Sequence, residues 1–342
     1  MKKILHVILI SLFSLTVISC AKESDKSSTT TSDDTTTTET TTTTETTTTS
    51  SGLFIAVGDS GTLLTSSDGT TWISRTDANV TSNYLRAVAY DGSSTLVAVG
   101  YSGTILTSSD GTTWTSRTSG TSSDLNNVSY NSGGTFGAVG DNGTVLTSPD
   151  GITWTDKTSS CGMTENMWDI DLGNSSIAVA IGDNGSIYTS TDGASSCTKR
   201  TSGTTVEFNE LIYGNGTFVA SGVSGTVLTS SDGISWTSRT SGTTNALYGG
   251  TYTASNVDGV KEFILVGGLG TILSSKDDGA SWTTISLTNL TTGTIWGIAR
   301  GGTTWVVTGS SGYISTISDS ESDVTTRASG TSEHLRRVFY KP

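Results

Sequence analysis

VGYSGTILTSSDGTTWTSR, residues 99–117, is the stretch that decides the fold, because copies of it return along the chain. LTSSDGTTW occurs at 64–72 and again at 106–114, and near copies stand at 146–154 and 228–236. Looser copies at 187–197, 272–282 and 314–324 complete a set of seven. Their acidic anchors are spaced by 40 to 46 residues: Asp68, Asp110, Asp150, Asp192, Asp232, Asp278 and Asp319. A period near forty with several strand-like runs per unit predicts a β-propeller.

Each unit contains four short strand-like runs. In the second unit they cover residues 84–90, 96–100, 104–108 and 113–118, which are rich in β-branched and aromatic residues. A tight hairpin at 101–103 joins the second run to the third, and Gly103 can take the positive φ that it requires. No stretch has the period of a helix. These features predict an all-β fold.

The two ends of the repeat region predict how the ring closes. Residues 53–58 (LFIAVG) match the second strand of a unit, whereas residues 334–340 (HLRRVFY) match the first. One unit is therefore split between the ends, and we expect the C-terminal strand to pair with the N-terminal strands. This gives a closed, seven-bladed propeller of four-stranded antiparallel blades over residues 52–342. A parallel β-helix is the alternative, but it offers no reason to split a unit in this way.

Residues 275–282 (SKDDGASW) match the Asp-box pattern S-x-D-x-G-x-[ST]-W, and shorter copies lack one residue before the glycine. In such a turn the aspartate accepts backbone hydrogen bonds, the glycine is conformationally permissive and the tryptophan packs between blades. Because these residues recur in most units, we assign them to the fold and not to catalysis. They are Asp68, Trp72, Asp110, Trp114, Asp150, Trp154, Asp192, Asp232, Trp236, Asp277, Gly279 and Trp282.

On these motifs, residues 53–340 resemble the sialidase-like Asp-box propellers, and in their regularity they resemble propellers of the photosystem assembly-factor type. The resemblance is specific for architecture and not for activity. A sialidase-like enzyme would hold its substrate carboxylate with three arginines. It would also use a tyrosine nucleophile helped by a glutamate, and an aspartate as acid and base. Xyloglucanase-type propellers instead use paired aspartates.

The arginines do not assemble into such a triad from the sequence alone. The Arg-Ile-Pro motif of sialidases is absent, and five arginines share one position on the outermost strand: Arg75, Arg117, Arg200, Arg239 and Arg327. Arg86, Arg300, Arg336 and Arg337 remain. We therefore assign no catalytic residue and expect a protein that is not an enzyme. Three arginines and a tyrosine around one pocket would favour the enzyme instead.

The amino terminus resembles a bacterial lipoprotein signal. Lys2 and Lys3 precede an apolar run that ends in Val17-Ile18-Ser19-Cys20, a lipobox-like sequence. We predict a signal peptide at 1–19 and a lipidated Cys20, with an ordinary signal peptide and an incidental cysteine as the alternative. The predicted location is the cell envelope, anchored to the membrane through the lipid. Ala21, in place of an aspartate, favours the outer membrane.

Residues 22–51 contain almost only Thr, Ser, Asp, Glu and Lys. Such a segment buries too little apolar surface to offset its ordering entropy, so we expect residues 20–51 to form a disordered tether. It serves either as a plain spacer or also as an acceptor for O-glycosylation.

Cys161 and Cys197 remain once Cys20 is lipidated. In an exported protein the expected state is a disulfide, which here would join two adjacent blades. Two free thiols are the alternative.

Function in a repeat protein is expected where the units differ. The longest departures on one face are residues 159–168 and 287–296, whereas an insertion at 253–262 falls on the opposite face. The candidate contact residues are Glu165, Trp168, Glu207, Glu210, Trp296 and His334. For each of them the alternative is a solvated loop residue or a side chain that packs between blades.

The net charge of −13 argues against a nucleic-acid partner. No His/Cys cluster has metal-ligand spacing, and no phosphate-binding or dinucleotide fingerprint occurs, so we expect no metal and no cofactor. We expect a monomeric, lipid-anchored scaffold that binds another protein. The alternatives are a glycan-binding or glycoside-hydrolysing propeller and a surface adhesin.

Overall fold

The computed structural model describes residues 52–173, 177–254, 261–318 and 324–342. The predicted signal peptide (1–19), the lipidation site Cys20, the tether (20–51), the anchor Asp319 and most of the insertion at 253–262 lie outside these ranges. Among the described residues, no helix has the length and apolar character needed to cross a membrane.

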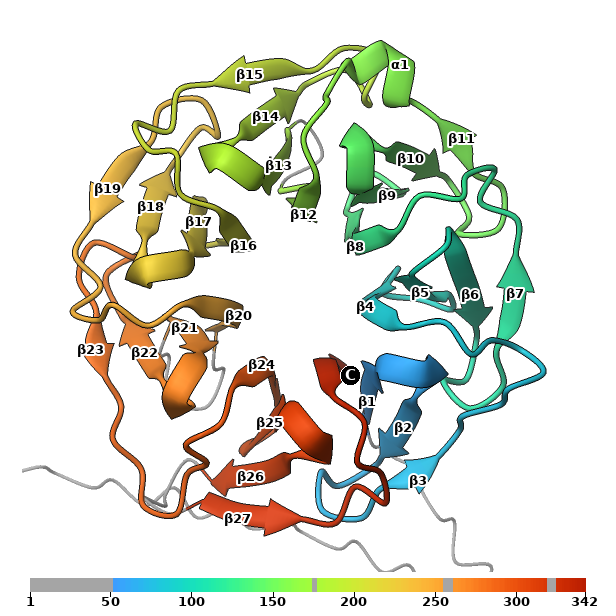
Figure 1. Ribbon diagram of the computed structural model, residues 1–342, viewed down its shortest axis with the longest axis vertical. Coiled ribbons are helices and arrows are strands. Elements are labelled where there is room, and N and C mark those ends of the chain that lie inside the picture. Colours follow the sequence, from blue (N-terminus) through green and yellow to red (C-terminus); the bar gives the residue numbers. More distant parts are fainter. Residues whose placement is uncertain (1–51, 174–176, 255–260, 319–323) are drawn as a thin grey trace, which may run out of the picture. The chain divides into compact units, whose positions relative to one another are not determined.

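Seven four-stranded antiparallel sheets surround a common axis, which confirms the predicted seven-bladed propeller (Figure 1). The inner strands are β28 (Leu335–Lys341), β4 (Leu85–Tyr90), β8 (Leu125–Asn131), β12 (Met167–Asp171), β16 (Phe208–Gly214), β20 (Leu247–Ala254) and β24 (Ile295–Gly301). The second strands are β1 (Leu53–Gly58), β5 (Leu96–Gly100), β9 (Thr135–Gly140), β13 (Ala178–Gly182), β17 (Thr217–Gly222), β21 (Lys261–Gly267) and β25 (Thr304–Gly309).

The third strands are β2 (Leu63–Ser66), β6 (Thr104–Ser108), β10 (Val145–Ser148), β14 (Ile187–Ser190), β18 (Val227–Ser230), β22 (Ile272–Ser275) and β26 (Ile314–Ser318). The outer strands are β3 (Ile73–Ser74), β7 (Thr115–Arg117), β11 (Thr155–Asp156), β15 (Thr198–Arg200), β19 (Thr237–Arg239), β23 (Thr283–Thr284) and β27 (Val324–Arg327). The short helices are α1 (Thr158–Cys161) and the 3-10 turns η1 (Asp59–Gly61), η2 (Asp141–Gly143), η3 (Asp183–Gly185), η4 (Val223–Gly225), η5 (Gly268–Gly270) and η6 (Ser310–Gly312). We number the blade that contains β1 as blade 1 and the others in chain order.

The ring closes through blade 1, whose strands lie in the order β28-β1-β2-β3. Leu53 is paired with Lys341 and Val57 with Arg337, so the C-terminal strand completes the sheet that the N-terminal strands begin. Phe54 and Tyr340 pack ring to ring across this junction, with centroids 4.7 Å apart. The closure therefore takes place as the split repeat unit predicted.

The apolar core lies between adjacent blades. The second strands are the most deeply buried, and in β5 all five residues, LVAVG, are buried. This explains why these runs are continuously apolar, because a strand covered on both faces has no solvent-facing side. Outer strands such as β3 are exposed.

The acidic turns between third and outer strands share one hydrogen-bond pattern in blades 1, 2, 3 and 5. Asp68 Oδ1 accepts hydrogen bonds from the backbone N–H groups of Thr70 and Thr71, at 2.7 and 2.9 Å. The indole N–H of Trp72 donates to the Gly69 carbonyl at 3.0 Å. A Cβ on Gly69, which has φ +75°, would lie 2.9 Å from Val306 of the preceding blade. The glycine is thus needed both for its dihedral and for the close approach of the neighbouring blade.

These turns make the protein sensitive to acid. The Ser196 hydroxyl lowers the pKa of Asp192 to about 2, and the Ser281 hydroxyl lowers that of Asp277 to about 2. A carboxyl whose folded-state pKa lies below its ordinary 3.8 stabilises the fold above that pH, and this contribution is lost as the pH falls toward 2. We expect the urea midpoint to drop steadily below about pH 4. Asp192→Asn and Asp277→Asn should make that drop shallower, and a midpoint that does not change with acidity would contradict the prediction.

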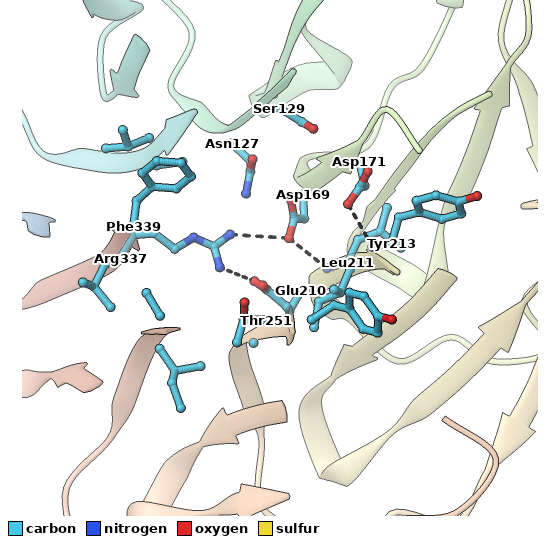
Figure 2. Close-up of a pocket in the computed structure, with 18 of the residues that line it drawn as sticks. Asn127, Ser129, Asp169, Asp171, Glu210, Leu211, Tyr213, Thr251, Arg337 and Phe339 are labelled. Carbon is cyan, nitrogen blue, oxygen red and sulfur yellow. Dashed lines mark hydrogen bonds and ion pairs between the residues drawn. The ribbon is translucent and has the colours of Figure 1, made fainter. Parts of the chain in front are cut away.

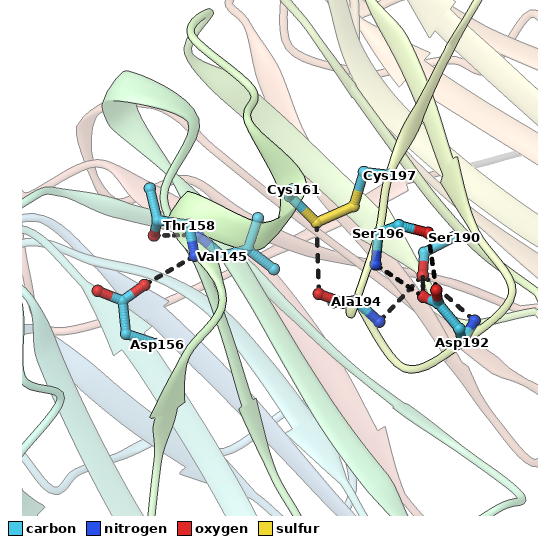
Figure 3. The surroundings of a disulfide bond; sticks show 9 residues. All are labelled: Val145, Asp156, Thr158, Cys161, Ser190, Asp192, Ala194, Ser196 and Cys197. Carbon is cyan, nitrogen blue, oxygen red and sulfur yellow. Dashed lines mark hydrogen bonds between the residues drawn. A yellow bond between two sulfur atoms is a disulfide. The ribbon is translucent and has the colours of Figure 1, made fainter.

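The predicted disulfide is present between Cys161 and Cys197, which are 36 residues apart in sequence (Figure 3). Cys161 ends helix α1, between blades 3 and 4, and Cys197 follows the acidic turn of blade 4. Counted from Ser190, Cys197 occupies the position that Trp282 occupies when counted from Ser275. In blade 4 a covalent link to the α1 segment that follows blade 3 therefore replaces the tryptophan that other blades carry at this position.

Removing the disulfide is expected to cost about 3–4 kcal/mol of unfolding free energy, because the crosslink restricts the unfolded chain. The measurement is urea unfolding of Cys161→Ser/Cys197→Ser against the oxidised wild type. Cys161→Ser/Cys197→Trp, which restores the tryptophan of the other blades, should recover part of the loss. Equal stability of the double serine variant and the wild type would contradict the prediction.

The five outer-strand arginines lie on the rim, as their repeated position predicted. Each donates its Nε–H to a threonine hydroxyl of the neighbouring third strand, for example Arg117 to Thr107 at 2.8 Å and Arg239 to Thr229 at 2.8 Å. They are therefore part of the repeated framework.

Candidate functional site

Every inner strand carries a β-bulge after its first residue, so that the second residue of each strand is left out of the pairing. The bulged residues differ from blade to blade: Arg336, Arg86, Asn126, Trp168, Asn209, Tyr248 and Trp296 for blades 1 to 7. Bulges re-aim side chains at the ends of strands. Here they form a ring of seven unlike side chains at one end of the axis.

Most members of this ring are held by the first residue of the hairpin turn in their own blade. Arg336 binds Asp59 through two hydrogen bonds, of 2.7 and 2.9 Å. The Trp168 indole N–H donates to Asp183 Oδ1 at 2.6 Å. Arg86 likewise pairs with Tyr101, Asn126 with Asp141, and Trp296 with Ser310. The ring is thus preorganised.

Blades 5 and 6 depart from this rule because their hairpins begin with Val223 and Gly268. Asn209 therefore donates to the Leu247 carbonyl of the next blade at 3.0 Å. Tyr248 packs on Trp296 with ring centroids 4.5 Å apart. This sector of the ring is consequently aromatic, and the two arginines of the ring, Arg336 and Arg86, follow it in blades 1 and 2.

A cavity of about 240 Å³ lies inside the ring, and we call it the mouth cavity. Its lining consists of the seven bulged residues together with Glu207 and Arg337. Guanidinium groups cover two of its indole rings, with Arg86 5.4 Å from the Trp168 ring and Arg336 4.8 Å from the Trp296 ring. Aromatic faces with a few fixed polar groups are typical of a binding site.

The mouth cavity brings three arginines and a tyrosine together, which is the set that would favour a sialidase-like enzyme. Two of the guanidiniums already bind carboxylates, Arg336 through Asp59 and Arg337 through Glu210. Arg86 is bound by the Tyr101 hydroxyl at 2.8 Å. The guanidiniums thus point to three different protein partners and not to one substrate carboxylate.

Glu207 is the acid of the mouth cavity. Burial and the nearby charge of Asp183 raise its pKa. Among the described residues its carboxylate has no hydrogen-bond donor. It is therefore the acidic group here that a bound molecule could engage.

A second cavity, of about 400 Å³, lies further along the same inner strands, and we call it the axial cavity. Figure 2 shows Asp169 and Asp171 of β12 and Glu210 of β16 facing it with Arg337 of β28. Arg337 binds Glu210 at 2.5 Å and Asp169 at 3.5 Å, and so reaches from blade 1 across the axis to blades 4 and 5. The guanidinium lines both cavities.

Two carboxylates of the axial cavity also accept hydrogen bonds from backbone N–H groups. Asp169 accepts the Leu211 N–H at 2.8 Å and Asp171 accepts the Tyr213 N–H at 2.9 Å. These amides lie on the inner edge of β16, where no further strand can pair with them. The carboxylates thus bind backbone N–H groups at the inner edge of the sheet, which have no neighbouring strand to pair with.

The titration of this cluster follows from its burial. Burial raises the pKa of Asp171 to about 6, and burial together with the charge of Glu210 raises that of Asp169. Burial also raises the pKa of Glu210. Burial alone would lower the pKa of Arg337, but the attraction of Glu210 and Asp169 raises it above its ordinary value. Arg337 therefore stays charged while the carboxyls hold protons more readily than usual.

The predicted contact residues separate into four places. Trp168, Glu207 and Trp296 meet in the mouth cavity, and Glu210 lies deeper, in the axial cavity. Glu165 lies beside the disulfide loop, bound by Lys199 and by the Tyr188 hydroxyl, which lower its pKa to about 2 against the effect of burial. His334 accepts the Ser311 N–H through Nδ1 at 2.9 Å and lines neither cavity.

The hairpins on the mouth face share an αL residue at their centre, which is Ser or Asn in six blades. In blade 6 it is Leu269, with φ +54° and a side chain that is 72% exposed. A leucine in this left-handed conformation costs about 1–2 kcal/mol. Because the side chain is exposed, no burial of apolar surface offsets that cost. Leu269 is therefore an outlier on the same face as the mouth cavity.

No protein-family model matches the sequence, and no curated protein matches it. Solved structures do match the fold. The structure of YCF48 bound to a D1 peptide has a TM-score of 0.59 and 17% identity, covering 76% of this chain and 93% of its own. YCF48 from Cyanidioschyzon merolae has a TM-score of 0.57 and 15% identity, covering 75% and 94%.

This protein and YCF48 share a propeller fold. The architecture of this protein thus agrees with the resemblance to propellers of the photosystem assembly-factor type. At identities of 17% and 15% the likeness shows the fold alone.

Sequence reasoning missed Arg86, Asn126, Asn209, Tyr248 and Arg336 as members of the ring. A signal was present, because each follows a large apolar residue at the same place in its repeat: Leu85, Leu125, Phe208, Leu247 and Leu335. Comparing that one column across the seven units would have picked out the ring, whereas the search for long loops found only Trp168 and Trp296.

Proposed function

We propose that this propeller is a scaffold that binds a segment of another protein at the mouth cavity. The observation that carries the proposal is the ring of seven unlike bulged side chains on an otherwise repeated framework. Aromatic anchors with arginines are the residues that dominate protein interfaces. The exposed Leu269 on the same face adds an apolar contact outside the cavity. YCF48, which shares the fold, has been solved bound to a D1 peptide.

The test is site-specific photo-crosslinking in the native cell. A photoreactive phenylalanine analogue replaces Tyr248 at the mouth cavity or, as a matched control, Thr70 on the opposite face, which is half-buried like Tyr248. We expect a reproducible protein adduct from position 248 that disappears when Trp168→Ala and Trp296→Ala are added. Adducts from position 70 alone, or from neither position, would overturn the proposal.

A glycan-active protein is the second candidate, and Arg86, Arg336, Arg337, Tyr248 and Glu207 around one cavity favour it. If Tyr248 were a nucleophile assisted by Glu207, a fluorogenic sialoside would be hydrolysed, and Tyr248→Phe would abolish the hydrolysis. The scaffold function instead predicts no turnover and a protein adduct that survives in Glu207→Gln.

The proposed site of action is the cell envelope, with a lipid on Cys20 as anchor and the outer membrane as the location. The lipobox-like sequence and Ala21 support this part of the proposal. Metabolic labelling with a radioactive fatty acid should mark the wild type and not Cys20→Ala. Protease treatment of intact cells then separates the two orientations, since digestion of the propeller would favour the adhesin and protection would favour a periplasmic scaffold.

A further inference from the structure

The guanidinium groups of the mouth cavity are already held by the protein. Two of the three bind carboxylates, as described above. The third, that of Arg86, donates to the Tyr101 hydroxyl and lies over the rings of Tyr101 and Trp168, 5.0 and 5.4 Å from their centroids. Its buried Nε–H has no acceptor, but the two ring faces supply negative potential in its place. What the cavity lacks is a partner for its acceptors.

Two acceptors that line the mouth cavity have no hydrogen-bond donor among the described residues. One is the carboxylate of Glu207, and the other is the side-chain oxygen of Asn126, a residue that is only 6% exposed. The Asn126 nitrogen donates to Asp141 Oδ1 at 2.9 Å and to the Met167 carbonyl at 3.0 Å, which fixes the amide with its oxygen unpaired. Because buried amide oxygens are normally paired, this one points to a donor that the protein does not supply.

The two acceptors lie on either side of Trp168. Asn126, in blade 3, is bonded to the Met167 carbonyl at the start of β12, and Glu207 immediately precedes β16 of blade 5. Burial and the charge of Asp183, the carboxylate that binds the Trp168 indole, raise the pKa of Glu207. The acceptors therefore share one sector of the cavity with an aromatic ring.

The charges of this sector are unbalanced. Asp141 and Asp183 are bound by neutral donors, an amide and an indole, and neither forms an ion pair with another described residue. Together with Glu207 they set three carboxylates against Arg86, the one guanidinium of the cavity that no described carboxylate neutralises. A cation that enters the cavity would reduce this excess, whereas an anion would add to it.

As a refinement that rests on the proposed scaffold function, we propose that the segment bound at the mouth cavity presents a basic side chain, whose cation donates to Glu207 and to the Asn126 oxygen. Lysine and arginine both carry such a cation, with several N–H donors and no acceptor. The apolar stem of either residue can lie along the aromatic wall formed by Tyr248 and Trp296. The cavity volume of about 240 Å³ equals about eight waters at about 30 Å³ each, which leaves room for one such side chain.

The test uses the full-length protein and two small probes. These are n-butylammonium, which mimics the lysine side chain, and n-butylguanidinium, which mimics that of arginine. Binding is followed by the indole N–H signals of Trp168 and Trp296 in NMR spectra, assigned with Trp168→Phe and Trp296→Phe. We expect saturable, millimolar binding of at least one cation, and no shift from butyrate or n-butanol at matched ionic strength. The cation that binds more tightly identifies the side chain.

Three variants locate the bound cation. Glu207→Gln should weaken its binding about tenfold, because a neutral amide replaces the carboxylate of a charge-assisted hydrogen bond. Asn126→Ala should weaken it less, since it removes an uncharged acceptor. Glu333→Gln is the matched control, because it removes a half-buried acid that lies in the loop before β28 and outside the mouth cavity, and it should bind as the wild type does.

The outcomes separate this inference from the scaffold function. Butyrate that binds as tightly as the cations, no shift from either cation, or equal binding by the wild type and Glu207→Gln would each overturn the inference. A protein adduct from position 248 would still support the scaffold in those cases. Cation binding without any adduct would instead contradict the scaffold. With both intact, Glu207→Gln weakens the complex without preventing its capture by crosslinking, whereas Glu207→Lys should abolish the adduct by charge repulsion.

Discussion

A chain that ends at His334 is expected to lose the cooperative fold, because blade 1 then lacks its inner strand β28. The truncation exposes the full edge of β1 and removes Arg336 and Arg337, which hold Asp59 and Glu210. An unpaired apolar edge at the axis is open to pairing with other chains. The measurements are thermal unfolding and size-exclusion chromatography, which should show aggregation or an expanded monomer.

A peptide with the sequence of residues 335–342 provides the decisive control. Added in excess, it should restore a sharp melting transition, because it can occupy the edge of β1 in the native register. Removal of Pro342 alone, which lies beyond β28, should leave the melting temperature unchanged. A truncated chain that melts within a few degrees of the wild type would contradict the role of the closure.

Arg337→Met is expected to lower the unfolding free energy by about 3–5 kcal/mol near neutral pH, because it leaves two buried carboxylates without their cation. The loss should shrink as the pH falls toward 5, since Asp169 and Glu210 can then take up protons. Urea unfolding followed by tryptophan fluorescence measures the change at both pH values.

The double variant Arg337→Met/Glu210→Gln isolates the cause. It should be more stable than Arg337→Met alone, because a neutral amide replaces one uncompensated charge. Arg117→Met, on the rim, removes only a hydrogen bond to Thr107 and should cost about 1 kcal/mol or less. If the rim and axial variants lose equal stability, the ion cluster does not hold the blades across the axis.

The architecture was predictable because its signals are local and repeated. Asp68 and Trp72 lie four residues apart and recur in most blades, and the match of residues 53–58 to a second strand revealed the split unit. The disulfide was predictable as well, because Cys161 and Cys197 were the two candidates left in the repeat region. These conclusions needed no knowledge of which side chains meet across the axis.

The candidate site was harder to predict from the sequence, for physical reasons. A β-bulge breaks the alternation from which strand orientation is read, so Tyr248 appears in the sequence as an ordinary strand residue. Glu210 was expected on the loop face, but it lies one residue past the bulge and inside the axial cavity. Its partner Arg337 is 127 residues away in sequence, and only the closure of the ring brings the two together.

The pairing of Leu53 with Lys341 has a consequence for orientation. Strand β1 runs from Leu53 to Gly58 and then enters η1 on the mouth face, so the chain comes into blade 1 from the opposite side of the ring. A group attached to the chain just before Gly52 would therefore meet blade 1 on the face opposite the mouth cavity and would leave the ring of bulged residues open.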